Sequence, residues 1–195
     1  MRLEVLDHGH QLPARAFQRI AALVFREEMD DVAKTAMHRP RFFGRPLLDF
    51  GRQVLRGPSY WTPGEREYMA VFTSRLNECP FCVRMHSETM RIESRGEVDI
   101  DGDGLVRPEL AAVLRLLEKV SRTPDDVSAQ DVDVVRAAGV PDDAIVDALH
   151  VNVVFNTVNR LANAFDWAWD SDDHVRVGAK VIHLFSYKLP GFVMR

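Results

Sequence analysis

The stretch of sequence that decides the fold reads Glu67-Tyr-Met-Ala-Val-Phe-Thr-Ser-Arg-Leu-Asn-Glu-Cys79-Pro-Phe-Cys82-Val-Arg-Met-His86. It holds both cysteines of the chain, three positions apart. His86 follows four residues after Cys82, and Glu67 precedes Cys79 by twelve residues. These four side chains are the candidates for chemistry.

Two helices are expected across this stretch. Thr62 and Glu65 have the spacing of a capping box, and the helix that they begin should reach about Leu76. Cys79 stands where a second helix would be capped, because Pro80 suits the first helical position. Residues 62–94 should therefore form a helix pair that carries the two cysteines.

On the second helix, Cys79, Cys82 and His86 share one face. Side chains three residues apart have Cβ atoms about 5–6 Å apart, so a disulfide would need only a modest adjustment. A helix N-terminus lowers the pKa of a cysteine. His86 lies within reach of Cys82 as a proton acceptor, and Glu67 could orient this histidine if the two helices fold back on each other.

The pattern Glu-x11-Cys-x2-Cys-x3-His across two helices resembles the AhpD-like alkylhydroperoxidase family, within the carboxymuconolactone decarboxylase superfamily. The resemblance extends beyond the motif. Segments 47–59 and 62–67 are similar to the lead-in of the peroxidase-related branch, and segments 144–150 and 155–164 also resemble it. It covers roughly residues 40–170 and implies an all-α, AhpD-like helical bundle.

The resemblance implies a thiol-dependent peroxidase that reduces organic hydroperoxides or hydrogen peroxide. Carried over residue by residue, Cys82 is the peroxidatic nucleophile, Cys79 the resolving cysteine, His86 the proton shuttle and Glu67 the proton relay. The best-studied members carry a second histidine between the cysteines, where this chain has Phe81. An external dithiol, in some relatives a lipoylated protein, would reduce the disulfide. No bound cofactor is implied.

A zinc site competes with this interpretation. Cys79, Cys82 and His86 could be three ligands, with Glu67 or His150 as the fourth. Structural zinc sites usually show a second Cys/His pair, which this chain does not have. We therefore favour redox chemistry and expect no metal.

Four further alternatives arise from the sequence. Segment 99–104 resembles the start of a calcium loop, but Leu110 stands where the loop needs a bidentate glutamate, so an acidic turn is favoured. Segment 79–82 resembles a thioredoxin dithiol, but that fold needs strands, which this sequence does not predict. The dithiol could also belong to a redox sensor or interaction protein without efficient turnover, whereas a decarboxylase-type lyase would need no cysteine pair.

Composition narrows the class of protein. The chain has 195 residues, 46% of them hydrophobic, and a net charge of −4, which suits one globular domain over residues 1–195 and argues against electrostatic binding of nucleic acid. The first residues lack the apolar segment of a signal peptide, and the apolar run at 20–25 is too short to span a bilayer. A close cysteine pair indicates redox chemistry in a reducing compartment, so we expect a cytoplasmic protein.

Seven or eight helices are expected in all, including one from Ala14 to about Met37 and a long one from Pro141 to at least Ala164. We expect an assembly of identical chains (a dimer, trimer or hexamer), with Trp167 and Trp169 as candidate interface residues. The long helix also carries His150, Asn156, Asn159 and Arg160, for which a structural role is favoured.

Overall fold

The computed structural model describes residues 1–95 and 106–194, and within these ranges no residue lies in a strand. The predicted all-α class is confirmed. The α-helices are α1 (Val5–His8), α2 (Leu12–Phe25), α3 (Asp31–His38), α4 (Arg45–Arg56), α5 (Pro63–Leu76), α6 (Pro80–Ser94), α7 (Pro108–Arg122), α8 (Ala129–Ala137), α9 (Asp142–Phe165) and α10 (Asp172–Phe185). A π-helix, η1 (Pro40–Gly44), precedes α4, and a 3₁₀ helix, η2 (Pro124–Asp126), precedes α8.

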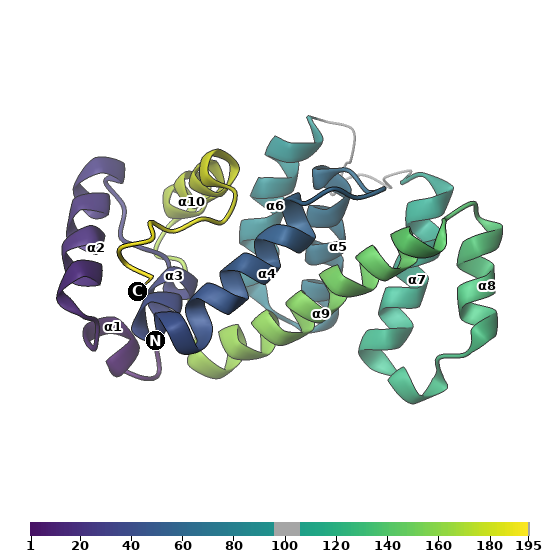
Figure 1. The fold of residues 1–195 in the computed structure, drawn as a ribbon, viewed down its shortest axis with the longest axis horizontal. Helices are drawn as coiled ribbons and strands as arrows, with labels where there is room; N and C mark the ends of the chain where they lie inside the picture. The colour runs from purple at the N-terminus through teal and green to yellow at the C-terminus, as the bar shows by residue number, and fades with distance from the viewer. Residues whose placement is uncertain (96–105, 195) are drawn as a thin grey trace.

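The hairpin of α5 and α6 lies in the middle of the molecule (Figure 1). The longest helix, α9, runs past it and packs on α5, α4 and α7. Helices α7 and α8 form one end of the molecule, and α1, α2 and α3 form the other. Helix α10 packs against α6.

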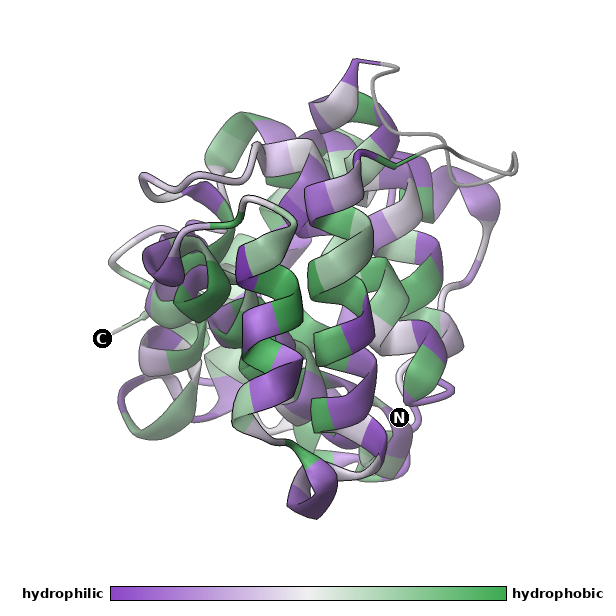
Figure 2. Ribbon diagram, turned by 90° about the vertical axis from the view of Figure 1, so that its right-hand side faces the viewer, coloured by the Kyte–Doolittle hydropathy of each residue, from purple (hydrophilic) through white to green (hydrophobic). Residues whose placement is uncertain are grey.

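The main apolar core lies between α5, α7 and α9. Helix α7 contributes an apolar stripe to it: Leu110, Val113, Leu114 and Leu117 are all buried. Trp61 is 1% exposed, and its indole N–H donates to the carbonyl of Ala144 at 2.7 Å, which ties the start of α5 to α9. Figure 2 shows hydrophobic and hydrophilic residues alternating around the helices, as expected where each helix buries one face.

The expectation of one helix from Ala14 to Met37 is wrong. Helix α2 ends at Arg26, which adopts a left-handed conformation with φ 58°. Asp30 then begins α3, because its carboxylate accepts a hydrogen bond from the backbone N–H of Ala33 at 2.7 Å. This split, together with the short helix α1, gives ten α-helices in the described residues, where seven or eight are predicted.

The α5–α6 hairpin forms as the sequence predicts. The backbone N–H of Thr62 donates to Glu65 at 2.9 Å, and the backbone N–H of Glu65 donates to the Thr62 hydroxyl at 3.2 Å, which completes the capping box. Gly64 lets the two helices approach closely, since a Cβ atom at this position would lie 2.7 Å from the Cα of Ser94. Glu78, with φ 50°, turns the chain into Cys79.

The acidic segment at 99–104, weighed above as a calcium loop, lies outside the described residues. No helix in the described part of the chain is long and apolar enough to cross a membrane.

Candidate active site

The two cysteines lie side by side at the start of α6. Cys79 is the N-cap residue and Cys82 lies in the first turn. The two cysteines are 3.1 Å apart, and neither forms a disulfide. Their exposed fractions are 0% and 1%, so the pair is covered by protein. The predicted proximity of the two thiols is therefore confirmed.

The two thiols differ in acidity. A hydrogen bond from the Cys82 thiol lowers the pKa of Cys79 to about 7, although burial opposes this shift. The backbone N–H groups of Cys82 and Phe81 and the side chain of Asn159 also lower the pKa. The same thiol–thiol hydrogen bond, together with burial, raises the pKa of Cys82 well above 9.0. The first proton lost from the pair therefore leaves a thiolate at the helix N-terminus, on Cys79.

Glu67 and His86 form the second part of the site. The hairpin brings Glu67 Oε2 to 2.7 Å from Nδ1 of His86, so the predicted contact between them is present. Glu67 is 0% exposed and His86 8%. Because Glu67 is an anion, we assign the Nδ1 proton to the histidine, which leaves Nε2 as the atom that can accept or deliver a proton.

Two residues outside the motif hold the other carboxylate oxygen, Glu67 Oε1. The hydroxyl of Tyr187, just after α10, donates to it at 2.7 Å. The guanidinium of Arg56, at the end of α4, forms an ion pair with it at 2.6 Å. The Arg56 guanidinium also lies over the Tyr187 ring, 5.1 Å from its centroid, and pairs with Glu93 at 3.1 Å.

These partners decide the charge of Glu67. Burial alone would raise the pKa of its carboxyl group, but His86, Arg56 and Tyr187 outweigh burial and lower the pKa to about 2. Burial and the neighbouring Glu67 anion raise the pKa of Tyr187 well above 10.0, so its hydroxyl stays protonated and donates. The site therefore holds a buried carboxylate that is charged at every physiological pH.

Tyr187 reaches Glu67 because of the backbone at the end of α10. Ser186 and Tyr187 both adopt left-handed conformations, with φ 50° and φ 64°. Neither is a glycine or asparagine, the residues that most often adopt this conformation. No sequence pattern signals this turn, and for that reason Tyr187 is absent from the predicted site.

An apolar cavity of about 150 Å³ reaches the dithiol. Cys82 and His86 line it, whereas Cys79 does not. Phe81, Met85 and Phe155 supply part of its apolar wall. A cavity of this size holds a benzene-sized group. Of the two cysteines, Cys82 is therefore the one that a molecule in the cavity would meet, although Cys79 is the more acidic.

Phe81 takes part in a stack of aromatic rings beside the cysteines. Its ring lies parallel to that of Trp169, with centroids 4.3 Å apart and an interplanar angle of 5°. The indole N–H of Trp169 donates to the Phe81 carbonyl at 2.9 Å. Trp167 is 5% exposed and packs against Phe81 and both cysteines, so it is buried within the chain.

A group of amides connects α9 to the dithiol. Asn159 donates to the Ser74 hydroxyl at 3.0 Å and accepts from Asn77 at 3.0 Å. Its side chain also lowers the pKa of both thiols. Asn156 accepts from Asn77 and from Arg160, both at 3.0 Å, which fits the structural role favoured for it.

His150 is exposed and does not line the cavity. The sequence places it on the long helix but cannot tell which way its side chain points. Throughout 1–95 and 106–194, no group of three or more His, Cys, Asp or Glu side chains is arranged to hold a metal ion.

The described part of the chain combines three features: an all-helical fold, a buried Cys-x2-Cys pair and a histidine–carboxylate contact. No protein-family model and no curated protein matches the sequence. Solved structures match its fold, and two of them are described as peroxidase-related proteins. An uncharacterized peroxidase-related protein from Silicibacter sp. TM1040 matches with a TM-score of 0.71 and 20% identity, over 90% of this chain and 95% of that one.

The second is described as an alkylhydroperoxidase AhpD core, an uncharacterized peroxidase-related protein from Ralstonia eutropha JMP134. It matches with a TM-score of 0.72 and 23% identity, over 87% of this chain and 92% of that one. The chain therefore has the fold of the AhpD-like, peroxidase-related proteins.

Proposed function

We propose that the protein is a thiol-dependent peroxidase that reduces organic hydroperoxides through a Cys79/Cys82 dithiol–disulfide cycle. The observation that carries the proposal is the apolar cavity, which both Cys82 and His86 line, with Cys79 only 3.1 Å from Cys82. A peroxide in the cavity meets a nucleophile, a proton donor and a resolving thiol in one place.

The first step starts from the singly deprotonated pair. The thiolate on Cys79 takes the proton of Cys82 across their hydrogen bond, which leaves the thiolate on the cysteine that faces the cavity. Cys82 attacks one peroxide oxygen, the O–O bond breaks, and Cys82 becomes a sulfenic acid. Nε2 of His86 holds the proton that the cysteine pair has lost, and the leaving alkoxide takes this proton and departs as the alcohol.

The second step closes the cycle. The Cys79 proton passes to His86, and the Cys79 thiolate attacks the sulfur of the Cys82 sulfenic acid. A disulfide forms as the S–O bond breaks, and the leaving hydroxide takes the proton back from His86 and departs as water. In balance, one hydroperoxide and two thiols give one alcohol, one water and one disulfide. An external dithiol then reduces the disulfide, which requires a reducing compartment such as the cytoplasm. We also propose that identical chains associate into an oligomer.

Coupled titration of thiols and peroxide tests the proposal. Reduced protein is mixed with a small organic hydroperoxide, and both thiols and peroxide are counted over time. We expect two thiols lost per peroxide in the wild type, no reaction in Cys82→Ser, and a sulfenic acid without a disulfide in Cys79→Ser.

Other outcomes would contradict parts of the proposal. Thiols that do not react would contradict peroxidase activity. An inert Cys79→Ser together with a reactive Cys82→Ser would exchange the two roles. Thiols that oxidise once but do not cycle with added dithiol would favour the redox-sensor alternative.

A further inference from the structure

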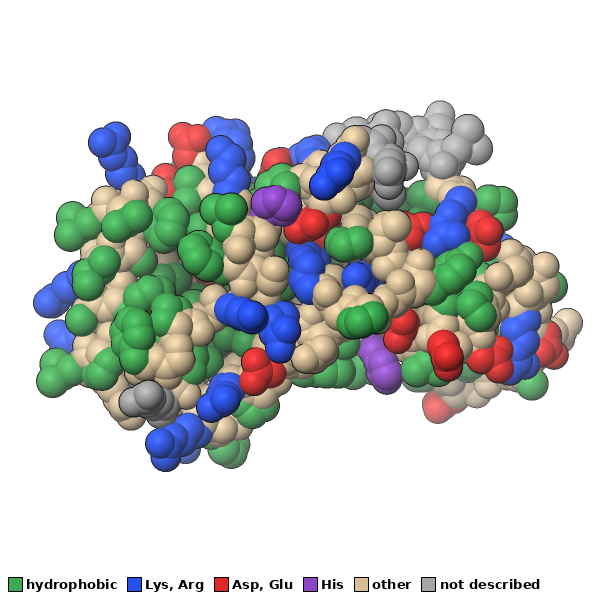
Figure 3. Space-filling model, turned by 45° about the horizontal axis from the view of Figure 1, so that its top comes forward, with side chains coloured by type: hydrophobic (Ala, Val, Ile, Leu, Met, Phe, Trp, Pro, Cys, Tyr) green, Lys and Arg blue, Asp and Glu red, His purple; other side chains and the backbone are tan. Residues whose placement is uncertain are grey.

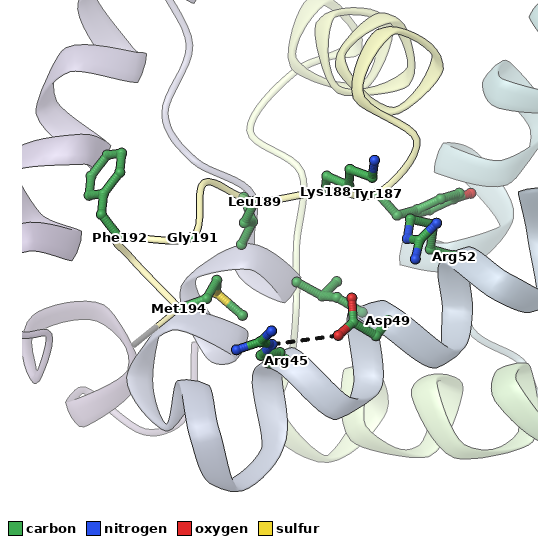
Figure 4. A pocket seen from close by; sticks show the side chains of 10 residues that line it. Arg45, Asp49, Arg52, Tyr187, Lys188, Leu189, Gly191, Phe192 and Met194 are labelled. Carbon is green, nitrogen blue, oxygen red and sulfur yellow. Dashed lines mark ion pairs between the residues drawn. The ribbon is translucent and has the colours of Figure 1, made fainter.

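A groove separate from the dithiol cavity lies between α4 and the segment that follows α10 (Figure 4). Its volume is about 660 Å³. Leu48, Leu189, Phe192 and Met194 give it an apolar floor, whereas Arg45, Arg52 and Lys188 give it three cationic side chains. Figure 3 shows one face of the molecule, on which Lys and Arg side chains lie beside a gathering of hydrophobic ones.

Within the described part of the chain, the positive charges of the groove are only partly balanced. Asp49 is the only acidic residue of its lining, and it pairs with Arg45 at 3.7 Å. Within the described ranges, the side chains of Arg52 and Lys188 have no hydrogen-bond or ion-pair partner. The Nε atom of Arg52 is also buried. A buried guanidinium N–H without an acceptor is costly, so a ligand that supplies an acceptor would be stabilised there.

The groove adjoins the cavity that reaches Cys82. Leu48, Tyr187, Lys188 and Leu189 line both spaces. The cavity is apolar and admits a benzene-sized group, whereas cationic side chains are part of the lining of the groove. The two spaces together match a molecule with an apolar end and an anionic end.

We propose that the groove binds the carboxylate of an amphipathic ligand, with Arg52 and Lys188 as its contacts, while the apolar part of the ligand enters the cavity at Cys82. A guanidinium suits a carboxylate because it donates two parallel hydrogen bonds. Resting on the proposed function, this assigns the substrate class as hydroperoxides that carry a carboxylate. Binding of the carboxylate itself needs no peroxide chemistry.

Calorimetric titration of the reduced protein tests the groove with three probes: octanoate, butyrate and 1-octanol. We expect octanoate to bind more tightly than either of the others, since butyrate lacks the apolar length and 1-octanol lacks the charge. Arg52→Gln and Lys188→Gln should each weaken octanoate binding about tenfold, the size of one lost charge-assisted hydrogen bond, and leave 1-octanol binding unchanged.

The matched control is Arg115→Gln. Arg115 is an exposed arginine on α7, remote from the groove, and its loss changes the net charge by the same amount. It should leave octanoate binding unchanged. Arg52→Lys keeps the charge and should recover part of the affinity, which separates a binding effect from damage to the fold.

A second measurement asks whether the apolar end reaches the dithiol. Octanoate should slow alkylation of the thiols by a neutral reagent, whereas butyrate should not. Equal binding of octanoate and 1-octanol, or equal weakening by Arg115→Gln, would overturn the proposal. If the peroxide titration fails and octanoate still binds, the proposed peroxidase activity is wrong and the proposed carboxylate site stands. If the titration succeeds and octanoate does not bind, the carboxylate site is wrong and the peroxidase activity stands.

Discussion

At the scale of single residues, Glu67 has the strongest effect on how the protein should respond to pH. Its pKa is about 2 in the folded chain and near 4.5 when it is unfolded. A carboxyl group with a lowered folded pKa contributes stability above the unfolded value and loses it as the pH falls toward the folded value. The window for this loss therefore runs from about pH 5 down to pH 2.

Replacing Glu67 with glutamine tests this window. The shift corresponds to about 3 kcal/mol of unfolding free energy, which the wild type should lose on acidification and Glu67→Gln should not. At pH 7 the variant should already be about 3–5 kcal/mol less stable, because Arg56 and His86 lose their partner. Urea unfolding at several pH values measures both effects. Glu118→Gln removes an exposed carboxylate as the control, and parallel pH curves for wild type and Glu67→Gln would contradict the expectation.

Tyr187→Phe removes one hydroxyl and leaves the ring that lies under Arg56. Glu67 then loses one of its donors, so its pKa should rise and the free energy of unfolding should fall by about 2 kcal/mol. Carbon NMR of the Glu67 carboxylate against pH measures the first effect, and urea unfolding the second. Tyr68→Phe is the control, because the Tyr68 hydroxyl has no hydrogen-bond partner among the described residues. An unchanged Glu67 titration would show that the Tyr187 hydroxyl does not hold the charge.

The acidity of Cys79 depends first on the Cys82 thiol. Thiolate absorbance of the reduced protein should therefore rise with a midpoint near pH 7. Cys82→Ala removes the donor and should move this midpoint toward 9.0, the ordinary value, whereas Cys82→Ser keeps a donor and should move it less. Equal midpoints in Cys82→Ala and the wild type would assign the low pKa to the helix N-terminus instead.

At the scale of helices, local signals in the sequence predict where most elements begin. The capping box at Thr62 and Glu65 forms as expected, because both of its hydrogen bonds lie within four residues of chain. The end of α2 at Arg26 could not be predicted in this way. Arginine favours helices, so its identity does not predict the left-handed conformation that ends the helix here.

The close approach of α5 and α6 leads to a prediction for Gly64. A Cβ atom there would lie 2.7 Å from the Ser94 backbone, so Gly64→Ala should force the helices apart and cost about 1–3 kcal/mol. Gly51→Ala on α4 is the matched control, since its Cβ would meet nothing within 4 Å. Helix propensity alone should make that variant up to about 1 kcal/mol more stable. Thermal unfolding of both compares them, and similar losses would contradict a steric role for Gly64.

At the scale of the whole molecule, the site joins segments that are distant in sequence. Glu67, Cys79, Cys82 and His86 could be predicted because they lie within one hairpin of 20 residues. Arg56 and Tyr187 could not be predicted as site residues, because both lie outside this hairpin. Tyr187 is 120 positions from Glu67 in the sequence. Helical periodicity indicates which residues turn inward, but it does not indicate which partner they meet.

The proposed substrate-binding groove is also formed by segments that are distant in sequence. The motif predicts a dithiol, and the family resemblance suggests peroxides. The groove is built from one face of α4 and from residues after α10, where the sequence analysis assigns no candidate site residue. Charge and apolar character there become meaningful only after the chain has folded.

The stack of Trp169 on Phe81 has a consequence for observing the protein. An excited indole transfers an electron readily to a disulfide, so a disulfide beside this stack should dim the emission of Trp167 and Trp169. Trp61 belongs to a different cluster and should give a constant background. Replacing Trp167 and Trp169 together with phenylalanine should abolish the change, and replacing Trp61 should not. The chain would then report the redox state of its own cysteines as light, without any added label.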